Sequence, residues 1–419
     1  MRRLTLSMIE PFWIKVSAFL TVMFFILLSD AILSDFVPGY IQGVVGSPVF
    51  MGLIMASSSV VGIVLDLIFP QLLRGVGVRW LAGSAMVGSL IFLVCLYFSV
   101  VLWPVLLLLI GMAAWGVYYE LDSFMTKQFV ADAAPLHSRG AVWGVVGVFR
   151  SLAYFLGPLM GAKLAHTGDR GVMLTAGAVL VVAYLVFLVI KLPKGQEGGK
   201  VVHGVSILEE IKHWWSLGRH VWSVLLVSLL VGIIDAVFWT TGTVVNDMLA
   251  EGHPAGGWFL STYMLPSLFV GFVVARWGIY QRKKRWAEIF MLFGGLFLML
   301  ITMSSQIWWI LAIVLISSVF FGLSWPLIDA TYSDFTVRMK RGRKHMIGIS
   351  SSVLSLAYII GPILAGGLAG MVGELESFVW VGGGVALVSF WLLWVTPRKI
   401  RLPEAEIAHW DGDRDRLVQ

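Results

Sequence analysis

The sequence predicts an all-α membrane protein with twelve transmembrane helices in two pseudo-symmetric six-helix bundles. Of its 419 residues 58% are hydrophobic and 13% are charged, an apolar excess over the roughly half-apolar balance of soluble domains. Apolar runs long enough to cross a hydrocarbon core of roughly 30 Å recur twelve times, and one segment of the first half is repeated in the second. Since backbone groups in lipid must bond within their own segment, each run must be a helix.

The apolar runs fall into two sets of six, separated by a polar segment. The first set covers 15–40, 49–73, 79–99, 102–124, 141–165 and 171–190. The second set covers 220–247, 257–277, 286–305, 307–329, 346–372 and 377–395. We therefore expect an N-terminal bundle over 1–190, a C-terminal bundle over 220–396 and a tail over 397–419.

The segment 191–219 is expected to be a cytoplasmic linker. It begins with a proline, glycines and lysines, which are typical of flexible linkers. Ser206-Ile-Leu-Glu209 then has the pattern of a capping box, which predicts a short amphipathic helix on the membrane surface. Ser7-Met-Ile-Glu10 repeats this pattern near the N-terminus. Both segments can also be read as disordered.

The basic residues predict the orientation of the spans, because cationic loops are retained in the cytoplasm. With both termini inside, twenty-seven of the thirty Lys and Arg residues lie at or beyond cytoplasmic helix ends. Lys163 and Arg170 lie outside, and Arg150 lies within a span. The protein is therefore expected to be a multi-pass protein of the inner or plasma membrane, and the net charge of +6 signals topology rather than nucleic-acid binding.

An internal repeat relates the two halves. Ser151-Leu-Ala-Tyr-Phe-Leu-Gly-Pro158 and Ser355-Leu-Ala-Tyr-Ile-Ile-Gly-Pro362 share six of eight residues at an offset of 204. Asp30-Ala31 and Asp235-Ala236 recur near the same spacing. Parallel six-helix repeats that handle substrate between the halves near the bilayer midplane are a recurrent plan among transporters.

Glycines and basic residues after spans 2 and 8 form a related loop pattern. Span 8 ends in Gly271-Phe-Val-Val-Ala-Arg276-Trp-Gly278, and span 2 is followed by Gly77 in a basic loop. This pattern resembles the loop signature of the major facilitator superfamily, Gly-x-x-x-Asp-Arg-x-Gly-Arg-Arg, although the acid of the signature is replaced here. The resemblance covers nearly the whole chain and implies secondary transport of a small molecule by alternating access.

Spans 5 and 11 also resemble this family, through its fifth-helix signature Gly-x8-Gly-x3-Gly-Pro-x-x-Gly-Gly, which is associated with exporters. Its core is Gly157-Pro158 in span 5 and Gly361-Pro362 in span 11. Proline removes an amide donor and kinks a helix, while small residues let neighbouring backbones approach. We expect these helices to act as pivots between the halves, or simply to pack closely.

Ionisable residues within the spans are candidates for function, because each costs at least about 2.5 kcal/mol in hydrocarbon. Asp30 lies in the outer half of span 1, and Asp235 has the equivalent depth in span 7. Both are expected to face a central cavity, and Asp30 is the candidate for binding the coupling proton or a cationic substrate. The alternative for Asp30 is a structural acid near the outer water, hydrogen-bonded among Ser29 and Ser34.

Three further charges lie in neighbouring spans. Glu120 and Asp122 occupy the cytoplasmic third of span 4, and Arg150 lies near the middle of span 5. Their depths favour a pair between Arg150 and Glu120, either functional or purely structural. Asp66 and Asp329, near inner ends of spans 2 and 10, are predicted to be solvated caps.

Some aromatic side chains are candidates for lining a substrate path by stacking or hydrogen bonding. These candidates are Trp115, Tyr118, Tyr119, Trp239 and Trp325. Packing within the bundle or anchoring at the membrane surface is the alternative role for each of them.

The pattern favours a transporter over an enzyme or a receptor. A phosphate-binding Gly-x-x-x-x-Gly-Lys-Ser/Thr loop is absent from the sequence, and the single cysteine allows no intrachain disulfide. We expect no cofactor, no metal and a monomer, with a proton as the coupling ion. Uptake of a metabolite is the alternative to proton-coupled efflux, and a membrane enzyme is the weaker alternative, with Glu120, Asp122 and Arg150 as its site.

Overall fold

The computed structural model describes residues 11–73, 76–99, 103–133, 139–164, 167–190, 207–277, 281–339 and 343–396. Within these ranges the regular structure is helical, without strands. The helices of the first half are α1 (Pro11–Val45), α2 (Pro48–Leu72), α3 (Val78–Phe98), α4 (Pro104–Ala133), α5 (Arg139–Leu164) and α6 (Gly168–Val189). Each matches one predicted span to within a few residues, except α4, which continues nine residues past the predicted end.

The second half has more helical segments because three of its spans are interrupted. The segments are α7 (Ile207–Phe238), α8 (Thr241–Gly252), the 3-10 helix η3 (Pro254–Trp258), α9 (Phe259–Met264), α10 (Ser267–Trp277), α11 (Lys283–Leu298), the 3-10 helix η4 (Ile301–Met303), α12 (Ile307–Arg338), α13 (Arg343–Val372) and α14 (Glu374–Val395). Twelve stretches of the described residues are long and apolar enough to cross a membrane. The prediction of a twelve-span α-helical membrane protein is confirmed.

The predicted amphipathic helix after the linker is not a separate element. Its first residue, Ile207, is the first residue of α7, which continues without a break into the membrane span. A separate helix would need a breaker near residue 219, and the only candidate is Gly218, whose cost of about 1 kcal/mol is too small to end a helix. The similar pattern around Ser7 lies outside the described residues.

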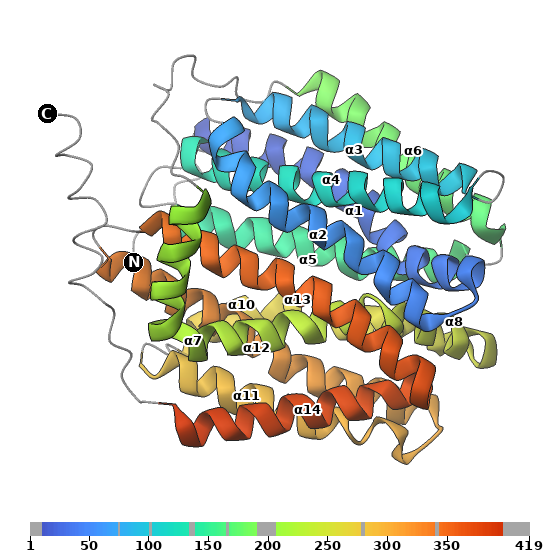
Figure 1. Cartoon of the computed structure of the whole chain (residues 1–419). Helices are drawn as coiled ribbons and strands as arrows, with labels where there is room; N and C mark the ends of the chain where they lie inside the picture. The colour runs from blue at the N-terminus through green and yellow to red at the C-terminus, as the bar shows by residue number, and fades with distance from the viewer. Residues whose placement is uncertain are drawn as a thin grey trace, which may run out of the picture.

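The long helices run side by side across Figure 1, with the two halves one above the other. The first half buries a core that extends from Val16 to Phe187, and the second buries a separate core from Leu217 to Leu392. Helices α1 and α5 pack together in the first half, and α7 and α13 do so in the second. Helices α2 and α13 form the most extensive contact between the halves.

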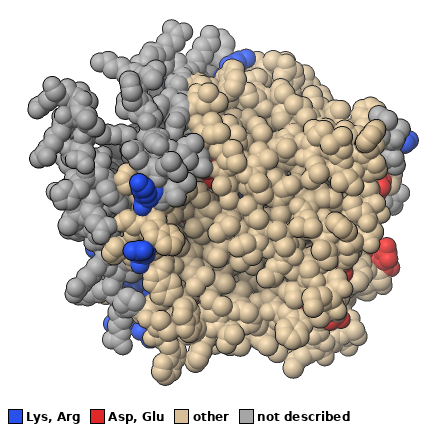
Figure 2. All heavy atoms as spheres, in the orientation of Figure 1, with Lys and Arg blue, Asp and Glu red and all other residues tan. Residues whose placement is uncertain are grey.

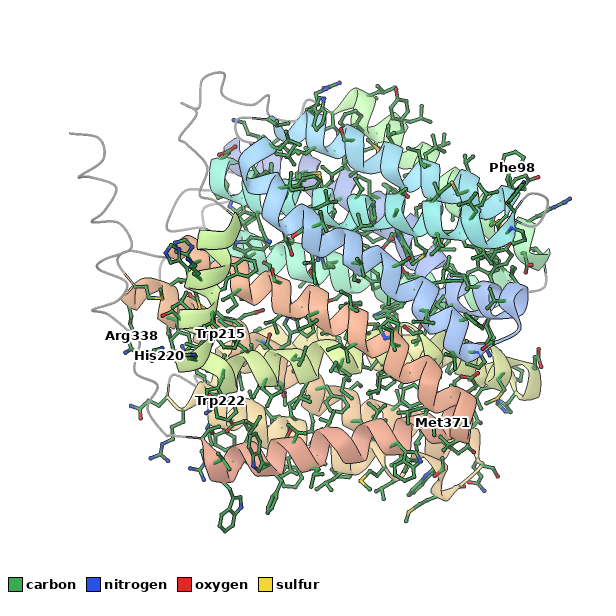
Figure 3. The ribbon with its side chains drawn as sticks, in the orientation of Figure 1. Phe98, Trp215, His220, Trp222, Arg338 and Met371 are labelled. Atoms are coloured by element: carbon green, nitrogen blue, oxygen red, sulfur yellow. The ribbon has the colours of Figure 1, made fainter. Side chains whose placement is uncertain are left out.

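Charge separates the two ends of the bundle. The end at which α10 and α12 finish carries Arg276, Arg282 and Arg338 and is called the basic end below. Most of the visible Lys and Arg lie toward the left of Figure 2 and most of the visible Asp and Glu toward the right. Figure 3 places Arg338 and Trp215 at the basic end. Met371 lies at the other end of the bundle, which is called the opposite end below.

Candidate functional site

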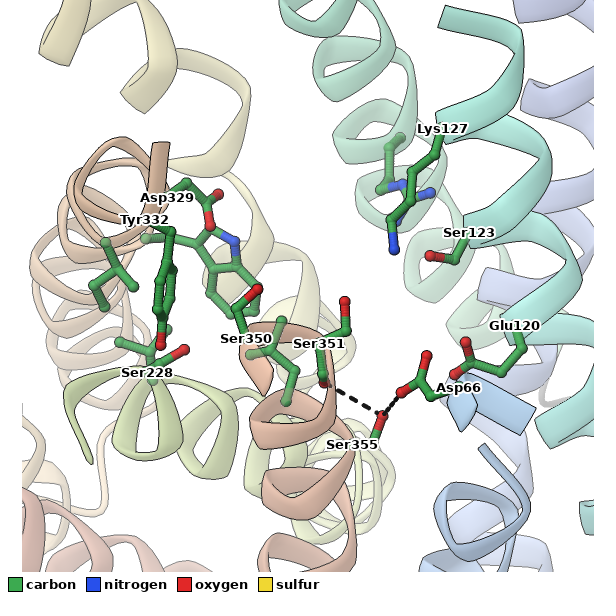
Figure 4. Close-up of a pocket in the computed structure, with 15 residues that line it drawn as sticks. Asp66, Glu120, Ser123, Lys127, Ser228, Asp329, Tyr332, Ser350, Ser351 and Ser355 are labelled. Carbon is green, nitrogen blue, oxygen red and sulfur yellow. Dashed lines mark hydrogen bonds between the residues drawn. The ribbon is translucent and has the colours of Figure 1, made fainter. Parts of the chain in front are cut away.

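A cavity of about 460 Å³ lies between the two halves and is called the central cavity here (Figure 4). Helices α2, α4 and α5 line it from the first half, and α7, α12 and α13 line it from the second. Its wall is rich in charged and hydroxyl side chains: Asp66, Glu120, Ser123, Lys127, Arg150, Ser228, Asp329, Tyr332, Ser350, Ser351 and Ser355. The apolar part of the wall is formed by Val231, Trp325, Ile328 and Leu354.

The central cavity lies toward the basic end, and the halves pack against each other at the opposite end. There Gln42 of α1 donates a hydrogen bond of 2.7 Å to Glu374 of α14. The backbones of α2 and α13 touch because glycine stands at both sides of their crossing, Gly52 against Pro362 and Gly366 against Pro48. The contact is thus closed at one end of the bundle and hollow toward the other.

Asp66 and Glu120 lie side by side on the first-half wall of the central cavity, and their carboxyl groups interact (Figure 4). We call them the acid pair. Gly62 of α2 makes room for Glu120, because a Cβ at position 62 would lie 3.1 Å from the Oε1 atom of Glu120. From the other half, the hydroxyl of Ser355 donates a 3.2 Å hydrogen bond to Oδ2 of Asp66.

The prediction that Asp66 and Asp329 cap their helices is wrong, although Asp329 is exposed as predicted. Both line the central cavity. Helices α2 and α12 continue to Leu72 and Arg338, so each aspartate lies roughly two turns inside its helix rather than at the end. Span 10 was predicted to end at 329, whereas α12 continues to Arg338. Span 2 was predicted to reach 73, so its helix end was placed correctly and only the role of Asp66 was misjudged.

The predicted partner of Arg150 was also wrong. Its guanidinium lies 3.0 Å from Oδ2 of Asp122, and not against Glu120. Residues two apart in a helix point about 200° away from each other. Asp122 therefore faces α5, whereas Glu120 faces α2 and Asp66. Depth in the membrane favoured Glu120, but the direction of the side chains around α4 selects Asp122.

Asp30 is fully buried in the first half. The indole N–H of Trp115 donates 2.6 Å to its Oδ1 atom, and the hydroxyl of Tyr154 donates 2.6 Å to Oδ2. Ser29 and Ser34 bond elsewhere, to the carbonyl of Ala176 and to Tyr119. The alternative role of Asp30 as an acid held by these two serines is therefore not supported.

Asp235 has an equivalent setting in the second half. The hydroxyl of Tyr263 donates 2.7 Å to its Oδ1 atom, and Tyr358 donates to Oδ2. Tyr154 and Tyr358 are equivalent residues of the internal repeat, separated by 204 positions. Each half thus contains one aspartate that is bonded to the tyrosine of its own fifth helix, with Asp30 fully buried and Asp235 partly buried.

Neither Asp30 nor Asp235 lines the central cavity, contrary to the expectation that both face one. Their carboxylates accept hydrogen bonds from aromatic side chains instead. Tyr154 packs edge-on against Trp239, the residue that follows α7, with ring centroids 5.3 Å apart. The hydrogen-bond donor to Asp30 therefore contacts the second half. Of the predicted aromatic candidates, Trp325 lines the central cavity.

The residues of the fifth-helix pattern hold helices together within each half. Gly157 of α5 lies directly on Ala31 of α1, and Gly361 of α13 lies on Ala236 of α7. Pro158 and Pro362 are inside their helices. The two crossings are equivalent in the repeat and lie next to these two aspartates, because Ala31 and Ala236 directly follow Asp30 and Asp235.

The residues of the loop pattern are not near the central cavity. Gly77 is the N-cap of α3 with φ of −72°, Gly271 lies inside α10, and Arg276 is exposed at its end. Gly278 is outside the described residues.

Metal binding has no evident basis in the part of the chain that the structure describes. His, Cys, Asp and Glu residues there do not form a group of three able to hold an ion. The sole cysteine, Cys95, is buried. The groups that the central cavity presents to a ligand are carboxylates, hydroxyls, two cationic side chains and aromatic rings.

Comparison with protein families gives a match to the model described as Major Facilitator Superfamily, over residues 18–342 and 224–414. Two curated relatives are each named MFS-type efflux pump MMF1. The protein from Mycosarcoma maydis is 26% identical over 239 residues, and that from Pseudozyma antarctica is 24% identical over 290 residues. These matches cover 52% and 62% of this chain, but 38% and 52% of the relatives. The chain thus spans about half of their length or less.

Solved structures share the fold at low identity. The human organic anion transporter MFSD10 (TETRAN) has a TM-score of 0.60 at 17% identity, over 92% of this chain and 100% of that one. The nucleoside transporter NupG has a TM-score of 0.69 at 10% identity, over 93% and 100%. A bacterial homolog of the human lysosomal transporter Spinster, in an inward-facing and unoccupied conformation, has 0.65 at 12% identity, over 92% and 95%.

Proposed function

The chain belongs to the major facilitator superfamily, and from this premise we propose that it exchanges protons for a small molecule by alternating access, as an exporter. Membrane transport by a multi-pass protein follows from the family itself. The substrate path, the coupling ion and the direction of transport are the parts that we propose here.

The observation that carries the proposal is the central cavity between the halves. Side chains from both halves line it, and the backbones of α2 and α13 pack closely at the opposite end. Rocking of the two bundles about their contact would close the cavity at the basic end and open it at the other. The close crossings of α5 on α1 and of α13 on α7 are suited to keep each bundle rigid in that motion.

We assign proton coupling to Asp30, since it is buried and its hydrogen bonds depend on the contact between the halves. Its partner Tyr154 also packs on Trp239 of the second half. A movement of the halves would displace Tyr154 and change the environment of the carboxylate. Burial disfavours the charged form of an acid and hydrogen bonds favour it, so such a change can drive uptake and release of a proton.

Efflux is favoured over uptake by the fifth-helix pattern and by the names of the two curated relatives. Uptake of a metabolite stays the alternative. The enzyme alternative is less favoured, because its three residues are divided between two interactions: Glu120 lies against Asp66, and Arg150 is paired with Asp122.

Flux into proteoliposomes tests the proposal. The purified chain is reconstituted and assayed with imposed pH or sodium gradients against a mixed panel of drugs and metabolites. A pH gradient should drive flux of at least one compound. Asp30→Asn should abolish this flux and spare counterflow exchange, because the amide keeps the shape of the carboxyl group but cannot release a proton.

The exposed acid Asp169 of α6 supplies the control, since Asp169→Asn should leave both assays unchanged. If Asp30→Asn transports at the wild-type rate under a pH gradient, Asp30 is not the coupling residue. If counterflow is lost as well, Asp30 contributes to substrate binding instead. Flux driven by sodium alone would refute proton coupling.

A further inference from the structure

The charges of the central cavity do not balance. Three carboxyl groups line it, those of Asp66, Glu120 and Asp329. The cationic residues of its wall are Lys127 and Arg150, and Arg150 is already neutralised by Asp122. With every group ionised, the wall would therefore keep an excess of negative charge facing the cavity.

The acid pair reduces this excess when the cavity is empty. Two carboxylates within hydrogen-bond range of each other repel strongly. Such a pair therefore retains one proton, which the two carboxyl groups share. Lys127 of α4 is the cationic group that acts on both members of the pair. Ser355 of α13 supplies a hydroxyl donor to Asp66.

The opposite wall of the central cavity combines an acid with aromatic rings. Trp325 and Asp329 are four residues apart on α12, so they share one face of the helix. Tyr332 lies beside them and is only 8% exposed, with its ring in the wall of the cavity next to Ser228 (Figure 4). Aromatic faces beside a carboxylate are the chemistry that binds organic cations.

We propose that the central cavity binds a cationic small molecule and that the bound cation displaces the proton shared by Asp66 and Glu120. The cation lies between the acid pair and the wall of Trp325 and Asp329, and the proton leaves to water. One positive charge enters the site and one departs, so charge balances without a further reactant. This inference rests on the proposed transport function and names the charge class of its substrate.

The position of the acid pair lets this exchange act on the contact between the halves. The hydrogen bond from Ser355 to Asp66 joins α13 to α2. Loading the cavity with a cation changes the charge of the group that accepts this bond. The exchange therefore takes place where the two bundles must separate or approach.

Binding measurements on the purified full chain in detergent test this inference without any transport step. Tetraphenylphosphonium and tetramethylammonium are permanent cations of different size, and tetraphenylborate is an anion with the shape of the first. We expect saturable binding of at least one cation, none of the anion, and release of about one proton per cation bound. Because the complex holds one proton fewer, cation affinity should rise up to about tenfold per pH unit wherever the pair holds its proton.

Variants separate the acid pair from the rest of the site. Glu120→Gln and Asp66→Asn should each abolish proton release and flatten the pH dependence, because a single remaining carboxylate has no shared proton to lose. Asp329→Asn should weaken cation binding but preserve proton release. Asp334→Asn, in an exposed ion pair with Lys283, is the control and should change neither. Gel filtration of every variant identifies misfolding, and two variants of the pair keep the test open if one misfolds.

The outcomes are distinct from those of the flux assay. Equal binding of tetraphenylborate, or no saturable binding of either cation, would overturn the cation class even if a pH gradient drives flux. Proton release that persists in both variants of the acid pair would overturn its role as the exchange site. Conversely, cation binding with release of a proton would stand even if flux proves to depend on sodium.

Discussion

At the scale of single residues, most intramembrane charges of this chain are held by specific partners. Burying an isolated charge in hydrocarbon is costly, and Asp30, Asp235 and Asp122 each have donors within hydrogen-bond distance. Asp35 differs, since its buried Oδ1 atom has no partner among the described residues. The acid pair differs again, because each carboxyl has the other as its neighbour.

The ion pair of Arg150 and Asp122 yields the first prediction at this scale. Asp122 is buried while the side chain of Arg150 is 45% exposed, so the pair is partly screened. Removing one partner should cost about 1–3 kcal/mol, less than for a fully buried pair. Removing both, with Arg150→Leu and Asp122→Leu together, should cost less than the sum of the single changes. Unfolding by sodium dodecyl sulfate measures each free energy.

The matched control is the same cycle with Glu120→Leu, which was the partner favoured by depth alone. Its coupling energy to Arg150 should stay within about 0.5 kcal/mol of zero. A larger coupling for Glu120 than for Asp122 would contradict the assigned pair.

At the scale of helices, hydropathy predicted the number and order of the spans, and the internal repeat predicted the equivalent crossings at Gly157 and Gly361. Two kinds of information were missing. Asp329 lies at the end of the apolar run of span 10, but α12 continues past it to Arg338, so its position inside a helix was not visible. The direction of a side chain around its helix, which separates Glu120 from Asp122, depends on packing with neighbours far away in sequence.

The contact between α2 and α13 depends on backbone approach and not on large side chains. A Cβ at Gly52 would overlap the carbonyl of Pro362, and one at Gly370 would lie 3.3 Å from Cγ2 of Val49. Since this contact joins the halves at the opposite end, it must open if the bundles rock.

A disulfide across this contact should therefore stop transport. In a background with Cys95→Ala, the pair Val49→Cys and Gly370→Cys should oxidise readily, because a Cβ at position 370 would lie 3.3 Å from Cγ2 of Val49. Flux should fall to background on oxidation and return on reduction. The two single-cysteine variants are the controls and should transport under both conditions. Full flux through the oxidised pair would show that this contact stays closed during transport.

At the scale of the whole molecule, the distribution of charge orients the bundle. Arg276, Arg282 and Arg338 gather at the basic end, whereas Asp247 and Glu251 lie in α8 toward the other. Cationic loops are retained in the cytoplasm, so the basic end should face inward. The central cavity, which lies toward the basic end, would then be entered from the cytoplasm, as an exporter requires.

The last prediction tests this orientation by thiol labelling in intact cells. Cys95→Ala removes the native thiol, and Arg282→Cys and Glu251→Cys then place single exposed thiols at the two ends. A membrane-impermeant maleimide should label position 251 and not position 282 in intact cells, and both after permeabilisation. The labelled position 251 proves that the chain is inserted and reactive, and labelling after permeabilisation proves that position 282 is accessible. If position 282 reacts in intact cells, the basic end faces outward, and export through the central cavity in this state would have the wrong direction.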